Sequence, residues 1–288
     1  MKKSKLAKVL TVSLAALMVF GLASCGGGSG KVSDKDITVI SREEGSGTRD
    51  AFTELTGVLQ DDVDKTVDTA EISNSTSVVT QSVAGNDAAI GYISLGSLDD
   101  TVKAVKVDGV EATVDNIKSG DYKIQRPFNI VTKGEVKELP ADFIKFIMSK
   151  DGQKIIEDEG YMSVNDNAEA YKASGLKGSI TLAGSTSVSP VMEVLADKYK
   201  ELNSGVTIEI QQTGSGAGIQ STTEGVCDIG MASRELKDEE TSQGLKSEEI
   251  ALDGIAVIVN KDNGVEDLSM DQIMKIFTGE ITNWADVK

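Results

Sequence analysis

Residues 180–188 read Ile-Thr-Leu-Ala-Gly-Ser-Thr-Ser-Val, an apolar run that passes directly into a glycine and three hydroxyl side chains. The apolar run predicts a buried strand. The apolar side chains that follow recur at intervals of three and four residues: Val188, Val191, Met192, Leu195 and Tyr199. This spacing predicts a helix that packs one apolar face against a sheet.

The same order of strand, polar turn and helix recurs along the chain. Short apolar or β-branched runs predict further strands over 37–40, 128–131, 206–210 and 256–259. Pro140 begins a predicted helix whose buried face includes Phe143, Ile144 and Ile147. Alternating strands and helices indicate an α/β fold with covered sheets.

The composition excludes several classes of function. The 288 residues include no histidine, which rules out catalysis or metal binding through imidazole. With 29 Lys and Arg against 46 Asp and Glu, the formal charge is −17. This charge argues against a nucleic-acid partner, because a phosphate backbone requires a basic surface. We expect no metal and no cofactor.

The N-terminus has the order of a lipoprotein signal. Lysines at positions 2, 3, 5 and 8 precede an apolar stretch over 9–22 that is short for a membrane span. Residues 22–25 read Leu-Ala-Ser-Cys and resemble the lipobox of bacterial lipoproteins, in which the cysteine becomes the lipidated first residue. We expect a signal peptide over 1–24, then lipidated Cys25 and a flexible tether over 25–35. The alternative is a plain signal peptide with a cysteine there by chance.

The mature chain is more acidic than the whole. Cleavage after residue 24 removes four lysines and no acidic residue, leaving 25 basic and 46 acidic residues and a formal charge of −21.

Besides Cys25 the only thiol is Cys227, for which we predict no disulfide and a buried position as a small hydrophobic side chain. The remaining length predicts two domains.

Three polar turns, over 41–49, 184–187 and 212–216, carry the candidate chemistry. Each follows a predicted strand and opens a helix, where unpaired backbone N–H groups and the helix dipole favour an anion. Glycine permits close approach of the backbone, hydroxyls add donors, and Arg42 offers a guanidinium fork for two oxygens. The alternative interpretation is that these Ser and Thr residues are only N-caps. None of the glycine turns matches a mononucleotide or dinucleotide motif.

Seven stretches of the chain resemble the phosphate-binding lipoproteins of bacterial phosphate ABC transporters. They are residues 41–48, 89–92, 184–188, 213–218, 228–234, 253–257 and 277–284. The resemblance implies an α/β fold with two lobes, the type II periplasmic-binding-protein-like or Venus-flytrap fold. It also implies a ligand in the cleft between the lobes.

The order of these stretches differs from the usual order in that family, because the second half comes first. We therefore expect a circularly permuted chain in which residues 165–177 join the former ends. Under this hypothesis residues 98–253 form a continuous lobe A, while 36–97 and 254–288 together form lobe B. The alternative is a fragment of a longer tandem protein.

The resemblance also implies the residues that contact phosphate. They are Arg42, Ser46, Gly47 and Thr48 in one lobe, and Ser185, Thr186, Ser187 and Ser215 in the other.

Arg234 stands where many family members carry an aspartate that accepts the proton of monohydrogen phosphate. Arginine has no hydrogen-bond acceptor, so it cannot accept the phosphate proton by which an aspartate distinguishes phosphate from sulfate. We favour an Arg234 that faces the ligand and count it among the binding residues. The alternative is an Arg234 that turns away and pairs with Glu235 or Asp238.

The leading hypothesis is a monomeric receptor, lipid-anchored at Cys25 on the extracytoplasmic face of the cell membrane, that captures inorganic phosphate and delivers it to an ABC permease. A receptor for another oxyanion, such as sulfate or molybdate, is the alternative within the same class. A phosphate sensor or interaction protein without transport is a further alternative. A serine hydrolase would need a base other than histidine, and no convincing pair is present, so we do not expect an enzyme.

Overall fold

The computed structural model describes residues 34–287. The expected signal peptide over 1–24, Cys25 and most of the tether over 25–35 lie outside the described residues and stay predictions. Among residues 34–287, no helix combines the length and the apolar character that a membrane crossing requires.

Strands and helices alternate along the described residues, as the sequence predicted. The strands are β1 (Thr38–Arg42), β2 (Leu59–Gln60), β3 (Val63–Asp64), β4 (Glu71–Ser73), β5 (Ala89–Ser94), β6 (Val102–Ala104), β7 (Lys106–Val107), β8 (Gln125–Lys133), β9 (Gly178–Gly184), β10 (Val206–Gln212), β11 (Ile229–Ala232), β12 (Leu245–Asn260) and β13 (Asp267–Leu268). The α-helices are α1 (Gly47–Thr56), α2 (Thr76–Gly85), α3 (Val114–Lys118), α4 (Glu138–Ile147), α5 (Lys150–Asp158), α6 (Ser189–Leu202), α7 (Ser215–Glu224), α8 (Asp238–Thr241) and α9 (Met270–Phe277). Short 3-10 helices cover η2 (Leu95–Ser97) and η3 (Trp284–Asp286).

One mixed sheet of nine strands organises these elements. Its order is β10-β9-β11-β8-β12-β5-β1-β4, with β6 paired to β12. Strands β10, β9 and β11 pair in parallel at one end of this order, and β5, β1 and β4 pair in parallel at the other. The pairs β11–β8, β8–β12 and β12–β5 between them are antiparallel. The mixed sheet confirms the α/β fold class.

The strand and helix predicted over 180–199 are confirmed. Strand β9 pairs with β10 and β11, and all five side chains of the predicted apolar stripe on α6 are buried. They pack with Phe143, Phe146 and Ile147 of α4 in a cluster that we call the second core. The helix predicted to begin at Pro140 begins at Glu138, and Ile144 is only partly buried there.

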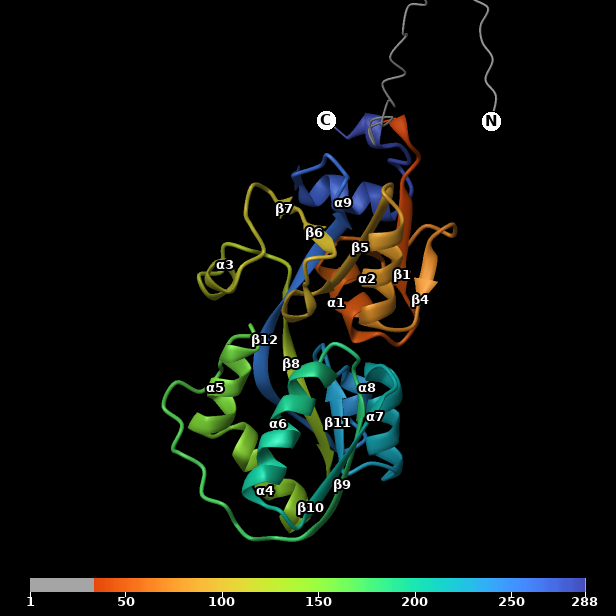
Figure 1. The fold of residues 1–288 in the computed structure, drawn as a ribbon. Helices are drawn as coiled ribbons and strands as arrows, with labels where there is room; N and C mark the ends of the chain where they lie inside the picture. Colours follow the sequence, from red (N-terminus) through yellow and green to blue (C-terminus); the bar gives the residue numbers. More distant parts are fainter. Residues whose placement is uncertain (1–33, 288) are drawn as a thin grey trace, which may run out of the picture. The chain divides into compact units, whose positions relative to one another are not determined.

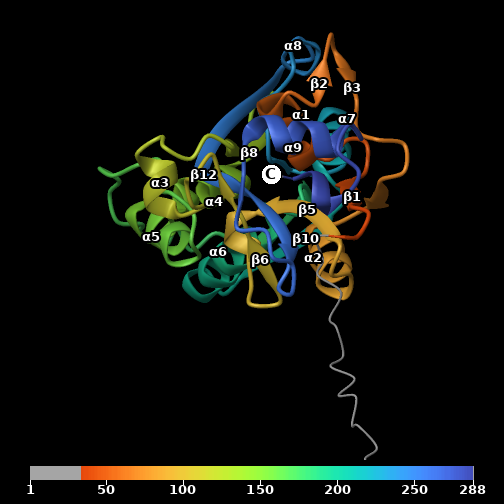
Figure 2. The same cartoon turned by 90° about the horizontal axis from the view of Figure 1, so that it is seen from above.

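A first core lies on one face of β1, β5 and the last residues of β12. Val39, Tyr92 and Val257 point to this face, where Phe52 of α1 and Phe277 of α9 cover them. The alternate residues of the same strands point to the opposite face and pack against α2. In Figure 2 the strands β1 and β5 lie between α1 and α9 on one side and α2 on the other.

Strand β12 belongs to both cores. Its 16 residues pair with β8 over 245–254 and with β5 over 255–259. Figure 1 shows β8 and β12 running from the elements of the second core to those of the first. These two strands are therefore the continuous connection between the cores.

Residues 98–124, which the sequence analysis assigned to lobe A, pack with the first core. Val105, Ile117 and Tyr122 contribute to it, and β6 pairs with the end of β12. The Tyr122 hydroxyl donates a 2.8 Å hydrogen bond to the Ile255 carbonyl. Residues 98–124 thus cover the same face of the sheet as the first core. The chain passes from the first core to the second at about residue 125, where β8 begins.

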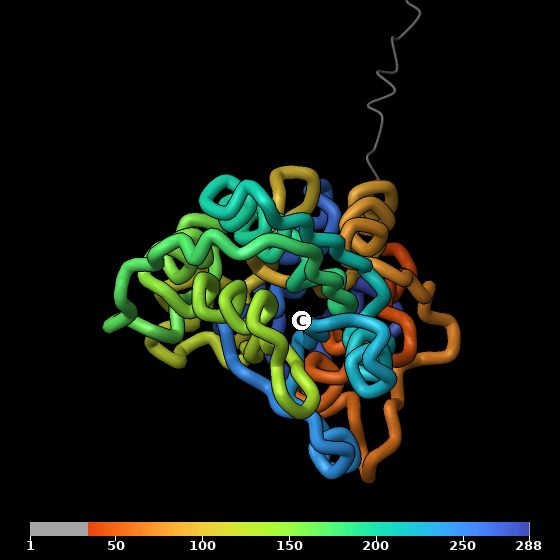
Figure 3. Tube along the Cα trace, turned by 90° about the horizontal axis from the view of Figure 1, so that it is seen from below, coloured from red at the N-terminus to blue at the C-terminus, as the bar shows by residue number. Residues whose placement is uncertain are grey.

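The segment over 165–177 is fastened to α4 and α6. The carboxylate of Asp142 accepts hydrogen bonds from the hydroxyls of Tyr171, Ser174 and Tyr199. Figure 3 shows this green segment passing along the outside of the molecule. Burial raises the pKa of Asp142, but these hydrogen bonds outweigh burial and hold the pKa below its ordinary value.

Asp142→Asn should lower the free energy of unfolding by about 1–2 kcal/mol at pH 7, because it removes the charge from a cluster of hydrogen bonds. A lowered pKa stabilises the fold above the ordinary value of 3.8 and ceases to do so as the pH falls through the lowered value. Urea denaturation should therefore show a difference from wild type that narrows below this pH. Asp158→Asn, which breaks an exposed pair with Lys154, is the matched control and should change little. Equal effects of the two substitutions would contradict this role.

Candidate functional site

The three predicted polar turns meet where the two cores adjoin. The Thr48 hydroxyl lies 2.9 Å from that of Ser187, and the Gly216 amide donates a 2.9 Å hydrogen bond to the Gly45 carbonyl. A Cβ on Gly47 would lie 2.5 Å from Ser215 Oγ, so glycine is required by this close approach. The structure thus brings residues far apart in sequence to one place.

Four buried hydroxyls form the centre of this place. The hydroxyls of Thr48 and Ser187 contact each other directly. Thr76 lies beside them, with its Oγ1 3.1 Å from Ser187 Oγ and 3.3 Å from Thr186 Oγ1. We call Thr48, Thr76, Thr186 and Ser187 the hydroxyl cluster. Thr48 and Thr76 come from α1 and α2, which cover the two faces of β1 and β5. Thr186 and Ser187 come from the turn before α6, on the side of the second core. The cluster therefore spans both cores.

Helix starts surround the hydroxyl cluster. Gly47, Thr76 and Ser215 are the first residues of α1, α2 and α7, and α6 begins two residues after Ser187. The first N–H groups of a helix lack intrahelical partners and carry partial positive charge. The arrangement therefore favours an anion without a large formal charge.

Arg42 supplies the guanidinium beside the cluster. Its side chain is 2% exposed, and Nη2 donates to Thr186 Oγ1 at 3.1 Å. Nε and Nη2 also donate to the two carboxylate oxygens of Glu43, each at 2.8 Å. Glu43 thus neutralises Arg42 at the edge of the site.

Two of the predicted residues make local contacts within their own turns, and a third contacts a neighbouring segment. Ser46 Oγ accepts from the Arg49 amide at the start of α1, and Ser185 Oγ accepts from the amides of Ser187 and Val188. These two contacts match the capping interpretation. The Ser215 hydroxyl accepts from the Ser233 amide at 3.2 Å, at the back of the site.

Arg234 is engaged by acidic groups rather than by the hydroxyl cluster. Nη1 and Nη2 donate to the two oxygens of Glu240 at 2.8 Å, and Nε lies 2.9 Å from Asp50 Oδ2 of α1. Its partners are thus Glu240 and Asp50, not the Glu235 or Asp238 side chains considered from the sequence. The sequence could not indicate Asp50, because that residue lies on a helix of the first core. The Asp50 contact joins the two cores.

A buried ion pair joins the neighbouring antiparallel strands β8 and β12 near the site. Arg126 Nη2 lies 3.1 Å from Asp253 Oδ2, and both side chains are 1% exposed. Burial raises the pKa of Asp253 to about 6, against the opposing effects of Arg126 and the Ser94 hydroxyl. Arg126 also donates to the Ser233 carbonyl, which links this pair to the wall of the site.

A cavity of about 590 Å³ reaches the hydroxyl cluster. Thr76 and Thr186 line it together with other polar side chains, which include Ser77, Thr80 and the acidic Asp99. It gives a solute access to the cluster from the side of α2.

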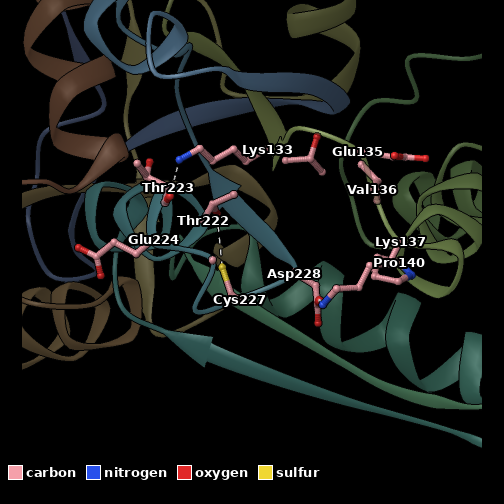
Figure 4. Close-up of a pocket in the computed structure, with 12 residues that line it drawn as sticks. Lys133, Glu135, Val136, Lys137, Pro140, Thr222, Thr223, Glu224, Cys227 and Asp228 are labelled. Carbon is pink, nitrogen blue, oxygen red and sulfur yellow. Dashed lines mark hydrogen bonds and ion pairs between the residues drawn. The ribbon is translucent and has the colours of Figure 1, made fainter.

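A second cavity, of about 320 Å³, contains none of the predicted site residues among those that line it. Figure 4 shows Lys133, Thr222, Cys227 and Asp228 around it. Lys137 pairs with Asp228 at 2.8 Å, and Lys133 donates to the Thr223 carbonyl. Cys227 is buried, as predicted, and burial raises the pKa of its free thiol. Among residues 34–287, no group of three or more His, Cys, Asp or Glu side chains could hold a metal ion.

Sequence reasoning missed Thr76. Residues 74–77 read Asn-Ser-Thr-Ser, a hydroxyl-rich helix start without the glycine that marked the other turns. The run of Ser and Thr before α2 was the available signal.

Comparison with known proteins identifies the family of this chain. The profile described as PBP superfamily domain matches residues 28–151 and 169–288. Phosphate-binding protein PstS 2 of Streptococcus agalactiae serotype V is 52% identical over 100% of this chain and 99% of its own length. The protein of the same name from Streptococcus pneumoniae serotype 4 is 47% identical over 99% of this chain and 100% of its own length.

A solved structure shares the fold. The crystal structure of a phosphate ABC transporter, phosphate-binding protein from Streptococcus pneumoniae has a TM-score of 0.72 and 48% identity, covering 88% of this chain and 100% of that one. The two sequence matches run through both partners from end to end, so these relatives have the same order of segments. The chain therefore belongs to the PBP superfamily domain family, together with these streptococcal proteins.

Proposed function

We propose that this protein is an extracytoplasmic solute-binding protein that captures inorganic phosphate and delivers it to an ABC permease, and that it is not an enzyme. The observation that carries the proposal is the hydroxyl cluster, where donors from both cores converge at helix starts beside Arg42. The names of the full-length relatives point to the same ligand and the same kind of transporter.

The proposed contacts to phosphate come from both cores. They are the side chains of Arg42, Thr48, Thr186, Ser187 and Ser215 with the backbone of Gly47. We assign Ser46 and Ser185 to shaping their turns, because their hydroxyls accept from local amides. Arg234 is left out of the contacts, because Glu240 and Asp50 engage its guanidinium.

We propose that two lobes close on the anion, lobe A over 125–253 and lobe B over 34–124 with 254–287. The two hydrophobic cores support this division, which moves the boundary of lobe A from residue 98 to residue 125. Closure would depend on ligand, because only the closed form gives the anion donors from both lobes.

We propose further that the segment order is a circular permutation of the usual family order. Its support is that residues near the two ends of the described chain lie together: the Ile37 amide donates to the Thr282 carbonyl at 2.8 Å, and the Trp284 amide to the Lys35 carbonyl at 3.0 Å. Ends that are adjacent in space can be joined, and the chain can be opened elsewhere, without disturbing the fold.

A receptor for another oxyanion such as sulfate remains the second candidate. It is favoured by the absence of a free carboxylate in the hydroxyl cluster, since the neighbouring Glu43 is already paired with Arg42. Calorimetric titration of the mature chain with phosphate and with sulfate at pH 6 and pH 8 decides between the two. Sulfate binding as tight as phosphate at both pH values would overturn the phosphate assignment, and no heat with either anion would favour a sensor or interaction protein.

Arg42→Ala should weaken phosphate binding by about 2 kcal/mol, or roughly 30-fold, because a charge-assisted hydrogen bond to the anion is lost. Calorimetry measures the affinity, and thermal melting verifies that the variant is folded. Lys275→Ala removes one positive charge from α9, where it pairs with Asp271, and serves as the control for net charge. Unchanged affinity in the Arg42 variant would remove this residue from the site.

Asp50→Asn should shift ligand-free protein toward an open form, because it removes an ion pair between the proposed lobes. The expected change in the ratio of closed to open forms is about two- to fivefold, the scale of a partly exposed pair. Energy transfer between fluorophores placed on the two lobes measures it. Asp271→Asn breaks a pair within one helix and is the control; identical transfer in both variants and wild type would refute a closing role for Asp50.

We also propose that the mature protein is a monomeric lipoprotein anchored at Cys25 to the extracytoplasmic face of the cell membrane. The order of lysines, apolar stretch, small residues and cysteine supports this, as does the glycine-rich stretch that follows. Cys25→Ala should remove palmitate labelling and move the protein from the membrane fraction to the soluble extracytoplasmic fraction. Cys227→Ala, which changes the buried thiol, should stay with the membrane. Retention of the Cys25 variant in the membrane fraction would exclude the anchor.

A further inference from the structure

We propose that Thr76 is a further phosphate-binding residue. Its hydroxyl donates a hydrogen bond to the anion from the side of the site that faces Thr186 and Ser187. The inference rests on the proposed function and adds α2 to the helices that contribute to the site. It assigns to residues 74–77 a role that the glycine turns alone did not suggest.

The position of Thr76 is the first support. Its side chain is buried, and its Oγ1 contacts Thr186 and Ser187, which come from the turn across the site. These residues are 110 and 111 positions away in sequence, so the contact exists only because the two cores adjoin. An anion held by Thr186 and Ser187 therefore lies within reach of Thr76.

The hydrogen-bonding state of Thr76 is the second support. The α2 N-cap is Ser75, whose Oγ accepts from the Val78 amide, so the Thr76 hydroxyl is not needed to cap its helix. Its contacts of 3.1 and 3.3 Å are long for bonds between hydroxyls, which favour 2.7–2.8 Å. An anionic oxygen would be a stronger acceptor than either neutral hydroxyl.

Access to Thr76 is the third support. The cavity of about 590 Å³ is lined by Thr76 and Thr186 at the end that meets the hydroxyl cluster. The backbone N–H groups at the start of α2 add partial positive charge on the same side. Thr76 is thus placed at the point where a solute passing through this cavity meets the cluster.

Thr76→Val tests the inference, because valine keeps the branched shape and removes the hydroxyl. Calorimetry should show phosphate binding weakened about tenfold, the scale of one hydrogen bond to a charged group. Thr76→Ser keeps the hydroxyl and should stay within about threefold of wild type.

Thr80→Val is the matched control, since Thr80 lines the same cavity and donates to the Thr76 carbonyl one turn along α2. It should bind phosphate as wild type does. If thermal melting shows that the valine variant is not folded, Thr76→Ala provides the same comparison.

The outcomes separate the two proposals. Wild-type protein that binds phosphate, together with a Thr76→Val variant of equal affinity, overturns the role of Thr76 and leaves the proposed function intact. An equal loss in the Thr80→Val variant also overturns it, because the effect would then come from the shape of the cavity. Wild-type protein that binds no phosphate overturns both.

Discussion

The pairing of β12 with both β8 and β5 is the constraint on which the rest of the structure depends. One strand of 16 residues supplies side chains to two hydrophobic cores, so its pairing with β8 and β5 keeps the cores connected. The Arg126–Asp253 pair joins β8 to β12, and both of its side chains are 1% exposed. Removing one partner of such a pair leaves an uncompensated buried charge, which is strongly unfavourable. These paired strands therefore fix the place where the two cores adjoin, and the polar turns of both sides meet there.

The charge of the chain and the proposed ligand have the same sign, and the site resolves this conflict locally. Each arginine near the site is already balanced by acidic groups: Arg42 by Glu43, and Arg234 by Glu240 and Asp50. Attraction of an anion then depends on donors that act only at short range, which are the hydroxyls, the helix N–H groups and the guanidinium of Arg42. The acidic surface beyond about 8–10 Å is screened by salt at physiological ionic strength. A strongly acidic protein can thus offer a site for an anion without a basic patch.

Sequence reasoning succeeded where a local pattern decides the structure. The stripe on α6 and the burial of Cys227 followed from side-chain spacing and chemistry, and the α/β fold class followed from alternating strands and helices. Sequence reasoning was less successful where the packing of a segment or the partner of a side chain depends on contacts between elements far apart in sequence. The packing of residues 98–124 is decided by β12, which is more than 120 positions away in sequence. The partner of Arg234 is likewise decided by the approach of α1.

The position of β12 near the end of the chain also governs the order in which the protein can fold. Residues 34–124 leave the ribosome with one edge of β5 unpaired, because its partner is at 255–259. The segments of the second core, including most of β12, are made before that partner emerges. The part synthesised first is therefore completed last, and its apolar strand edge stays open to other chains during synthesis.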